Sequence, residues 1–484
     1  MGRERADLIV AHGVVIAMDE ARRIIEDGAL AIRADRIVAV GTSADILARH
    51  EAGETIDATG MVVIPGLIDA HAHAGHGLIK TLGAGDSEAW YRACELAYTV
   101  ASTPEFWHAE AQLAALERLK FGVTAGVSLL GGGDTILRTD DPVYGDAHCE
   151  GVAQVGTRSL VAIGPTRPPH PRDYARWEGE TQTRYRVDVE TQFATCETLV
   201  KRWHGAQGQR LSIALITPTL REEHARDLSA ADFDKARAQA RRAQGMAREA
   251  GLIFTQDGHT KGSVAFADEL GILGPNALLS HATDLTDEEI AICARTGTMI
   301  AHNPSAVASI LGRCPAPELM AAGVTVALGS DATAPDRSAD MFRHMQQAMH
   351  YHRRHFRDPD VLPVGRTLQM CTRDGARALG LEDEIGSLEP GKKADVTLVD
   401  LARPHLYPPN MPLHRLVCFA NGADVHTVIV DGRVALRERK PVFVDERTIL
   451  ENARREADKM MRRAGIEAMT ETPRETWGLP PAIR

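Results

Sequence analysis

The 484-residue sequence has no apolar run close to the ~20 residues that a membrane-spanning helix requires. Its seven cysteines are scattered, odd in number and never spaced as Cys-x-x-Cys, which argues against a disulfide framework or a cysteine-based zinc site. Residues 1–7 are charged and lead directly into a strand, unlike a secretory signal. We therefore expect a cytoplasmic protein with reduced cysteines.

The sequence also lacks an excess of positive charge. Its formal net charge is -11, which argues against nucleic acid or an anionic membrane surface as a partner. Hydrophobic residues make up 44% of the chain, enough for a substantial core, and the length exceeds that of one ordinary domain. The composition favours a globular protein that acts on a small molecule.

The chain shows two patterns of predicted secondary structure. Short strands and turns fill the first 60 residues, and glycine-punctuated β structure returns after residue 380. Between them strands alternate with amphipathic helices in eight units, the number that an α/β fold of the (β/α)₈ barrel type requires. We expect strands at 62–71, 123–130, 158–165, 211–217, 252–256, 277–282, 298–302 and 324–331.

These two patterns predict how the chain is divided into domains. Residues 62–380 would form the barrel. Residues 1–61 and 381–445 would together form a small β-sandwich domain, and residues 446–484 a C-terminal helix and tail.

The first barrel strand carries the most informative motif. A β-branched run at 62–68 leads to His71 and His73, whose i, i+2 spacing directs both imidazoles to the same side of an extended chain. Two imidazoles where a strand opens into a loop are typical of a divalent metal site. We therefore predict that His71 and His73 are metal ligands.

Polar residues also stand at the ends of later strands, where a barrel carries its chemistry. Asp331 ends the eighth strand and could hold a metal through one oxygen while taking a proton from a bound water through the other. His281 ends the sixth and could stabilise an oxyanion or carry a proton. His302 ends the seventh and is a candidate substrate contact. Asp331 alone could equally cap a helix, so the prediction depends on the coincidence of these strand ends.

Together these motifs resemble the amidohydrolase superfamily, most closely the branch of cytosine and guanine deaminases and triazine chlorohydrolases. The resemblance covers nearly the whole chain and rests on residues 65–73, His281, 302–305, 329–331, 392–396 and 430–433. It implies a distorted barrel with one or two divalent ions. By this resemblance His71, His73 and Asp331 are ligands, Asp331 is also the general base, and His281 is catalytic, or a ligand if a second ion binds.

The chain departs from that branch at the fifth strand, where relatives have a metal-binding His and, three residues later, a Glu that handles protons. Gln256 and His259 occupy these places. An amide oxygen is a harder and weaker ligand than imidazole. Three outcomes stay open: Gln256 ligates through Oε1, His259 or His281 replaces it, or the metal is held weakly.

The same resemblance bears on the number of ions and on the pocket. The third and fourth strands end without the Lys or Glu of binuclear relatives, so we expect one ion, with zinc the leading identity and iron, manganese or cobalt as alternatives. His76 stands where the branch often carries a substrate-touching Gln. His259 and Trp90 are further candidate substrate contacts, although Trp90 could equally be a packing residue. The oligomeric state that is usual in this family also implies a homo-oligomer.

The leading interpretation is a metal-dependent hydrolase of a C–N bond, of amide, urea or carbamate type, in a small neutral molecule. It rests on the complete set of His71, His73, His281 and Asp331 without the deaminase Glu. One alternative is a deaminase or dechlorinase of an N-heterocycle, with His259 in place of the missing Glu. Another is a non-catalytic scaffold that kept the barrel and lost the site.

Overall fold

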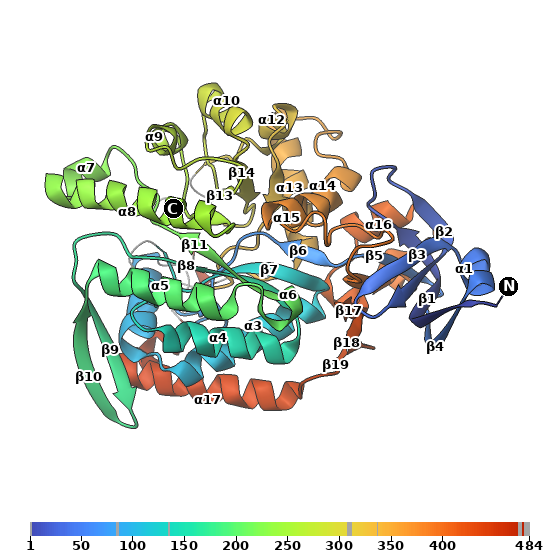
Figure 1. Ribbon diagram of the computed structural model, residues 1–484, viewed down its shortest axis with the longest axis horizontal. Helices are drawn as coiled ribbons and strands as arrows, with labels where there is room; N and C mark the ends of the chain where they lie inside the picture. Colours follow the sequence, from blue (N-terminus) through green and yellow to red (C-terminus); the bar gives the residue numbers. More distant parts are fainter. Residues whose placement is uncertain are drawn as a thin grey trace.

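Two large sheets organise the computed structural model, which describes residues 2–83, 87–133, 136–306, 312–335, 337–472 and 477–478. One is an eight-stranded parallel barrel in the centre of the molecule (Figure 1). The other is built from both chain ends and lies beside the barrel, next to the N-terminus. The chain is therefore an α/β protein with a barrel and an added sheet, as the sequence predicts.

The eight barrel strands follow one another in chain order, and one lies within each of the eight expected ranges. Their bounds are β6 (Leu67–Asp69), β7 (Val123–Leu129), β8 (Arg158–Ile163), β11 (Leu211–Ile216), β12 (Phe254–Gln256), β13 (Ala277–Ser280), β14 (Met299–His302) and β15 (Val326–Leu328).

Helices connect successive strands and cover the outside of the barrel (Figure 1). The first half has α2 (Ser87–Glu95), the π-helical turn η2 (Leu96–Ala101), α3 (Pro104–Lys120), α4 (Pro142–Val155), α5 (Val189–Trp203) and α6 (Ala206–Gln209). The second half has α7 (His224–Asp227), α8 (Ala230–Glu249), α9 (Ser263–Glu269), α10 (Asp287–Thr296), α12 (Ala316–Ala321), α13 (Met341–Phe356), α14 (Val364–Met370) and α15 (Arg373–Ala378).

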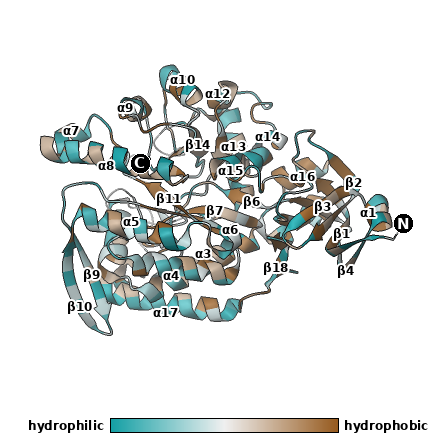
Figure 2. Cartoon of the chain, viewed as in Figure 1, coloured by the Kyte–Doolittle hydropathy of each residue, from teal (hydrophilic) through white to brown (hydrophobic). Residues whose placement is uncertain are grey.

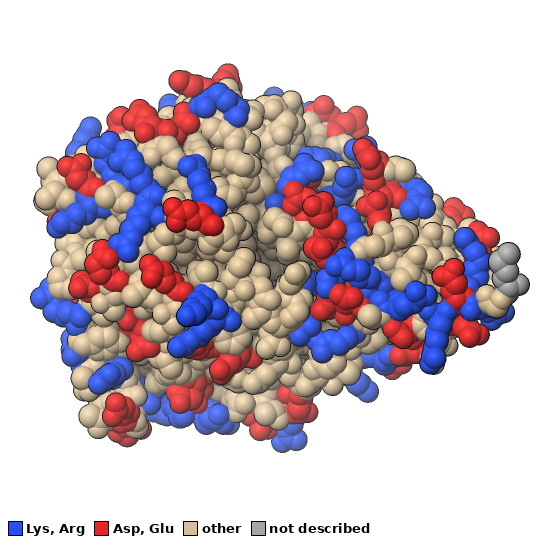
Figure 3. All heavy atoms as spheres, in the orientation of Figure 1, with Lys and Arg blue, Asp and Glu red and all other residues tan. Residues whose placement is uncertain are grey.

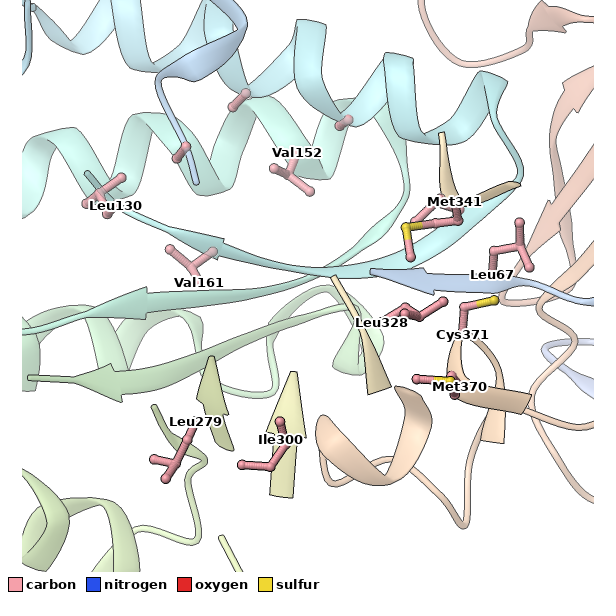
Figure 4. Close-up of a cluster of buried hydrophobic side chains, with 14 of the residues drawn as sticks. Leu67, Leu130, Val152, Val161, Leu279, Ile300, Leu328, Met341, Met370 and Cys371 are labelled. Atoms are coloured by element: carbon pink, nitrogen blue, oxygen red, sulfur yellow. The ribbon is translucent and has the colours of Figure 1, made fainter. Parts of the chain in front are cut away.

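Alternation along the strands separates an outer core from an inner one. Val161 and Leu279 belong to the large cluster between strands and helices, where Val152 of α4 also packs (Figure 4). The alternate positions, such as Ala162 and Leu278, form a second cluster with α15. Side chains of successive strand residues point to opposite faces, so this pattern sets the register of the barrel. Strands are correspondingly apolar in Figure 2, whereas the helices mix apolar and polar residues.

The barrel closes between its first and last strands by few hydrogen bonds. Backbone N–H groups of Ala70 and Asp331 donate to the carbonyls of Leu328 (2.9 Å) and His71 (2.8 Å). An isolated parallel bridge joins Ala72 to Asp331. This closure therefore lies at the ends of the strands, beside the predicted metal ligands.

The second sheet combines strands from both ends of the chain, with β5 between the two groups. Its members are β1 (Glu4–Ile16), β2 (Ile24–Arg33), β3 (Arg36–Thr42), β4 (His50–Asp57), β5 (Met61–Pro65), β16 (Val396–Asp400), β17 (Val425–Val430), β18 (Arg433–Arg437) and β19 (Lys440–Pro441). The short helices α1 (Ser43–Arg49) and α16 (Pro412–Cys418) accompany it. The domain limits at 61/62, 380/381 and 445/446 stay a prediction.

The strand predicted from 62 to 71 is two strands in different sheets. β5 pairs with β1 and β16, whereas β6 pairs with β7 in the barrel. Gly66 stands between them, and a Cβ there would lie 2.1 Å from Thr124 Oγ1. Glycine thus permits the close approach at which the chain passes from one sheet to the other.

A β-hairpin that the sequence analysis did not predict follows the third barrel strand. It comprises β9 (Arg172–Glu178) and β10 (Thr181–Val187) and extends from the end of the molecule opposite the second sheet (Figure 1). Trp177 Nε1 donates to the carbonyl of Val100 (2.8 Å), and Arg463 of the C-terminal helix α17 (Glu446–Ala464) lies over the Trp177 ring. The hairpin and α17 are thereby held together.

The molecular surface has no single-sign area on the face seen in Figure 3, where acidic and basic side chains are interspersed. All seven cysteines are free thiols, and six of them are buried. Among the described residues, no helix combines the length and the apolar character that crossing a membrane requires.

A buried carboxyl group supports the turn that follows the first barrel strand. Glu110 of α3 is fully buried, and its Oε1 accepts a hydrogen bond from the backbone N–H of Gly77 (3.2 Å). Its Oε2 lies 3.9 Å from Nδ1 of His148, and neither atom has a hydrogen-bond partner among the described residues. Burial raises the pKa of Glu110 from 4.5 to about 7.

We predict that Glu110→Gln makes the protein more stable above pH 7 and removes one source of pH dependence. A carboxyl whose folded pKa is raised binds its proton more tightly when folded, so stability falls as pH rises from 4.5 to 7. The shift corresponds to a loss of about 3 kcal/mol. Thermal unfolding at pH 4.5 and pH 8 measures it. Glu105→Gln on the same helix is the control, because the pKa of Glu105 is lowered and its loss should not stabilise the protein. Equal destabilisation by Glu110→Gln at both pH values would contradict the prediction.

Candidate metal centre and active site

His71 and His73 lie just beyond β6 and are both buried. The Nδ1 of His73 is 2.9 Å from the carbonyl of Gly131, so an Nδ1–H donor there leaves the Nε2 lone pair free. This Nε2 lies 3.1 Å from Asp331 Oδ1, and the Nε2 of His71 lies 3.4 Å from the same oxygen. The end of the first strand therefore places two imidazole nitrogens beside the same oxygen of Asp331.

His281 and Asp331 follow β13 and β15 in a backbone conformation that side-chain-bearing residues rarely adopt. Their φ angles are 68° and 61°, in the left-handed region. Such strain is found where the surroundings fix a residue, often at functional sites. The backbone N–H of His281 donates to the carbonyl of Ala301 (3.0 Å), which holds it against the next strand. The Nε2 of His281 lies 3.9 Å from Asp331 Oδ1.

Asp257 is the site residue that the sequence analysis missed. It follows β12 directly, and its Oδ1 lies 3.0 Å from His281 Nε2 and 3.3 Å from His71 Nε2. Ser280 Oγ donates to the same oxygen (2.7 Å), and Oδ2 lies 3.5 Å from His73 Nε2. The sequence signal for it is the carboxylate itself, which stands at the end of a predicted barrel strand.

Gln256 and His259 lie near the cluster without taking part in it. Gln256 Nε2 donates to the carbonyl of Pro218 (3.0 Å), and its Oε1 lies 3.3 Å from His259 Nε2. His259 Nδ1 lies 2.8 Å from Ser263 Oγ. The expected Gln256 ligand and His259 substrate contact are therefore engaged with each other and with the barrel wall, because Asp257, one residue later, is the side chain that faces the histidines.

His302 also lies outside the cluster. Its Nε2 is 3.3 Å from Nε2 of His352 on α13, and burial holds the pKa of His302 well below its usual value. Its neighbour Asn303 approaches the site instead, with Nδ2 3.5 Å from Nδ1 of His281. His302 thus connects a barrel strand to a helix, whereas the sequence analysis expected it to contact substrate.

The rings of His76 and Trp90 lie next to His73, and we call these two side chains the His76–Trp90 wall. The rings of His73 and His76 are 4.9 Å apart, and those of His76 and Trp90 are 5.6 Å apart. Tyr98 Oη lies 3.2 Å from His76 Nδ1. The Nε2 of His76 and the Nε1 of Trp90 are buried and have no hydrogen-bond partner within the described ranges. Burial lowers the pKa of His76 to about 3, so this wall offers neutral polar groups.

The carboxylates and imidazoles of the central cluster shift one another's pKa values. Burial alone would raise the pKa of Asp257 and Asp331, but the facing imidazoles, His71 for Asp257 and His281 for Asp331, hold both well below the usual range. Burial would likewise lower the pKa of His71, but Asp257 and Asp331 raise it to about 10. Buried charges of this kind require partners of opposite sign.

These donors fit a divalent cation. Ligand atoms of His71, Asp257, His281 and Asp331 all lie within 4.8 Å of one another. Several pairs are 3.0 to 3.4 Å apart, close to the separation of two donors that share an ion at about 2.0–2.2 Å. Imidazole nitrogens and carboxylate oxygens suit zinc and other first-row divalent metals.

Sequence comparison identifies relatives over nearly the whole chain. The family model described as "Amidohydrolase family" matches residues 62–435, and a model described as "Imidazolonepropionase-like composite domain, bacteria" matches residues 28–50. A 5-methylthioadenosine/S-adenosylhomocysteine deaminase of Desulforudis audaxviator is 33% identical over 439 residues, 90% of this chain and 95% of the relative. A 5'-deoxyadenosine deaminase of Methanosarcina mazei is 29% identical over 467 residues, 95% of this chain and 99% of the relative.

Solved structures agree with this relationship. A zinc-bound adenosine deaminase from Xanthomonas campestris superposes with a TM-score of 0.82 at 25% identity, over 95% of this chain and 100% of that one. The zinc complex of atrazine chlorohydrolase from Arthrobacter aurescens shares the fold, with a TM-score of 0.77 at 22% identity over 93% of this chain and 100% of that one. With the barrel, the His/Asp cluster and the family match in agreement, the chain belongs to the amidohydrolase family and is a metal-dependent hydrolase of C–N bonds.

Proposed function

We propose that this enzyme hydrolyses an amide, urea or carbamate bond in a small neutral molecule, with Asp331 as general base. The convergence of His71, His73, Asp257, His281 and Asp331 on one point is the observation that carries the proposal. His71, His73, Asp257 and Asp331 would hold one divalent ion, for which we propose zinc. When bound, the ion would polarise a water and lower its pKa toward neutrality.

Asp331 is suited to move the proton of the attacking water. Its shortest contacts with His71, His73 and His281 all involve Oδ1. Water oxygen would bond to the carbonyl carbon, the C–N bond would break, and Asp331 would pass the proton to the departing nitrogen. His281 would stabilise the charge that develops on the carbonyl oxygen.

The number of proton-transferring residues that each reaction needs is the reason to prefer a carbonyl substrate over an aminated ring. Ring deamination also requires protonation of a ring nitrogen, and the branch that this chain resembles uses a Glu for it. His259 stands in that place, and both its ring nitrogens lie within hydrogen-bond distance of Ser263 and Gln256. Hydrolysis of a carbonyl C–N bond needs only the proton that Asp331 carries.

Deamination of an N-heterocycle is the second candidate, and dechlorination belongs with it. Two observations favour it: the relatives described above are deaminases of adenosine-type compounds, and the His76–Trp90 wall offers aromatic rings with neutral polar atoms. Asp257 would then supply the second proton-handling carboxylate. The same wall supports neutral substrates in either case, since His76 carries no charge at neutral pH.

We further propose that the enzyme works in the cytoplasm as a homo-oligomer. Seven free thiols support a reducing compartment. The homo-oligomer is inferred from the oligomeric state that is usual in the family. Neither nucleic acid nor a membrane is proposed as a partner, on the basis of the net charge of -11.

Replacing the general base should abolish turnover while most of the metal is retained. For Asp331→Asn we expect kcat to fall by about 10²- to 10⁴-fold, because the amide keeps one oxygen donor and loses the base. Steady-state kinetics and elemental analysis measure the two quantities. Asp268→Asn is the matched control, since Asp268 forms an ion pair with Arg295 on helices away from the cluster. Unchanged activity of Asp331→Asn would refute the assignment.

The fifth-strand ligand can be identified by comparing neighbours. Asp257→Ala removes both oxygen donors and should weaken metal affinity by more than the roughly 10- to 100-fold that loss of an outer-sphere partner costs, whereas Gln256→Ala should retain the ion. Competition with a chromogenic chelator gives both dissociation constants. Loss of metal from Gln256→Ala together with full binding by Asp257→Ala would reverse the assignment.

A substrate panel distinguishes the two candidate reactions. Zinc-loaded enzyme should release amine or ammonia from amides, ureas or carbamates, and Asp331→Asn serves as the blank. Ammonia or chloride release from aminated or chlorinated rings alone would select the second candidate instead. Removal of the metal by chelation should stop either reaction, and its return should restore it.

A further inference from the structure

Asp331 occupies a demanding position in the barrel. Its φ of 61° is unfavourable for a residue with a side chain, and it stands at the closure between the first and last strands. Its backbone N–H donates to the carbonyl of His71 at that closure (2.8 Å). A further interaction near this residue would therefore fix both its backbone and the direction of its carboxylate.

The neighbouring Ser330 supplies such an interaction through Asp69. Ser330 is fully buried, and its backbone N–H donates to Asp69 Oδ1 (2.8 Å) while its Oγ–H donates to Asp69 Oδ2 (2.6 Å). One carboxylate thus holds both polar groups of the residue that precedes Asp331. Asp69 ends β6, two residues before His71, so the same carboxylate connects the two strands that carry metal ligands.

Arg118 of α3 completes the arrangement from outside the barrel. Its Nη2 donates to Asp69 Oδ2 (3.1 Å) and to the carbonyl of Val127 (2.6 Å), and its Nη1 donates to Ser128 Oγ (3.0 Å). A Cβ at Gly126 would lie 3.0 Å from the guanidinium carbon, so the glycine allows the guanidinium to lie against β7. The buried charge of Asp69 is thereby paired.

We propose that Arg118, Asp69 and Ser330 are positioning residues for the general base Asp331. They lie outside the cluster of converging ligand atoms and act by holding Asp331 at the point where it meets His71 and His73. The inference rests on the proposed role of Asp331. It adds that the geometry of the metal centre is set by a helix on the outside of the barrel as well as by the strand ends.

The arrangement predicts a graded response in the metal centre. Ser330→Ala removes one of the two hydrogen bonds to Asp69 and keeps the backbone N–H, so we expect a change in the visible spectrum of the cobalt-loaded protein and a loss of Co²⁺ affinity of about tenfold. Asp69→Asn disturbs both bonds and the pairing with Arg118, so its effect should be larger, up to about 100-fold. The double variant should match Asp69→Asn alone, because the two residues act through one interaction.

Cobalt titration, visible spectroscopy and thermal unfolding of the full-length variants test the inference without a known substrate. Ser159→Ala is the matched control, since Ser159 is a buried barrel serine whose Oγ has no hydrogen-bond partner among the described residues. It should leave the spectrum and the affinity unchanged. If Asp69→Asn does not fold, Ser330→Ala still decides the matter.

Folded Ser330→Ala with the wild-type spectrum and affinity would overturn the inference and leave the proposed function intact. A wild-type protein that binds no cobalt would contradict both. Binding by the wild-type protein with loss only in the two positioning variants, and not in Ser159→Ala, would support the inference.

Discussion

The rest of the structure is arranged around two ionised carboxylates, Asp257 and Asp331, removed from water at one end of the barrel. Charges of like sign this close together are stable only when positive groups are equally close. A divalent cation held between these carboxylates and His71, His73 and His281 would provide that balance. The strand ends bring these groups together from four distant parts of the sequence, so the site exists only when the barrel is closed.

Closing the barrel therefore also assembles the site. Few hydrogen bonds join the first strand to the last, and one of them links the backbones of His71 and Asp331 themselves. The left-handed backbone at His281 and Asp331 is stable because neighbouring strands hold it. Packing between strands and helices supplies the stability on which these strained positions depend.

Much of this architecture is predictable from the sequence, for physical reasons. Buried parallel strands are short apolar runs that end in polar residues, so all eight were located, and His71, His73, His281 and Asp331 were found at their ends. Asp257 was missed because a shift of one residue changes which side chain faces the site, and strand ends are the least certain feature of a sequence pattern. The passage from β5 to β6 coincides with Pro65-Gly66, a pair that often interrupts a strand, but its exact form depends on the position of Thr124, which the local sequence does not contain.

The position of β5 has a consequence for how this protein can be divided. β5 is paired on one side with a strand from the beginning of the chain and on the other with a strand from near its end, and it leads through a single glycine to the strand before His71. A fragment cut to the barrel alone would therefore expose the hydrogen-bonding edges of β5 just before the first two ligands. Strands from both ends of the chain thus support the segment that leads to His71 and His73.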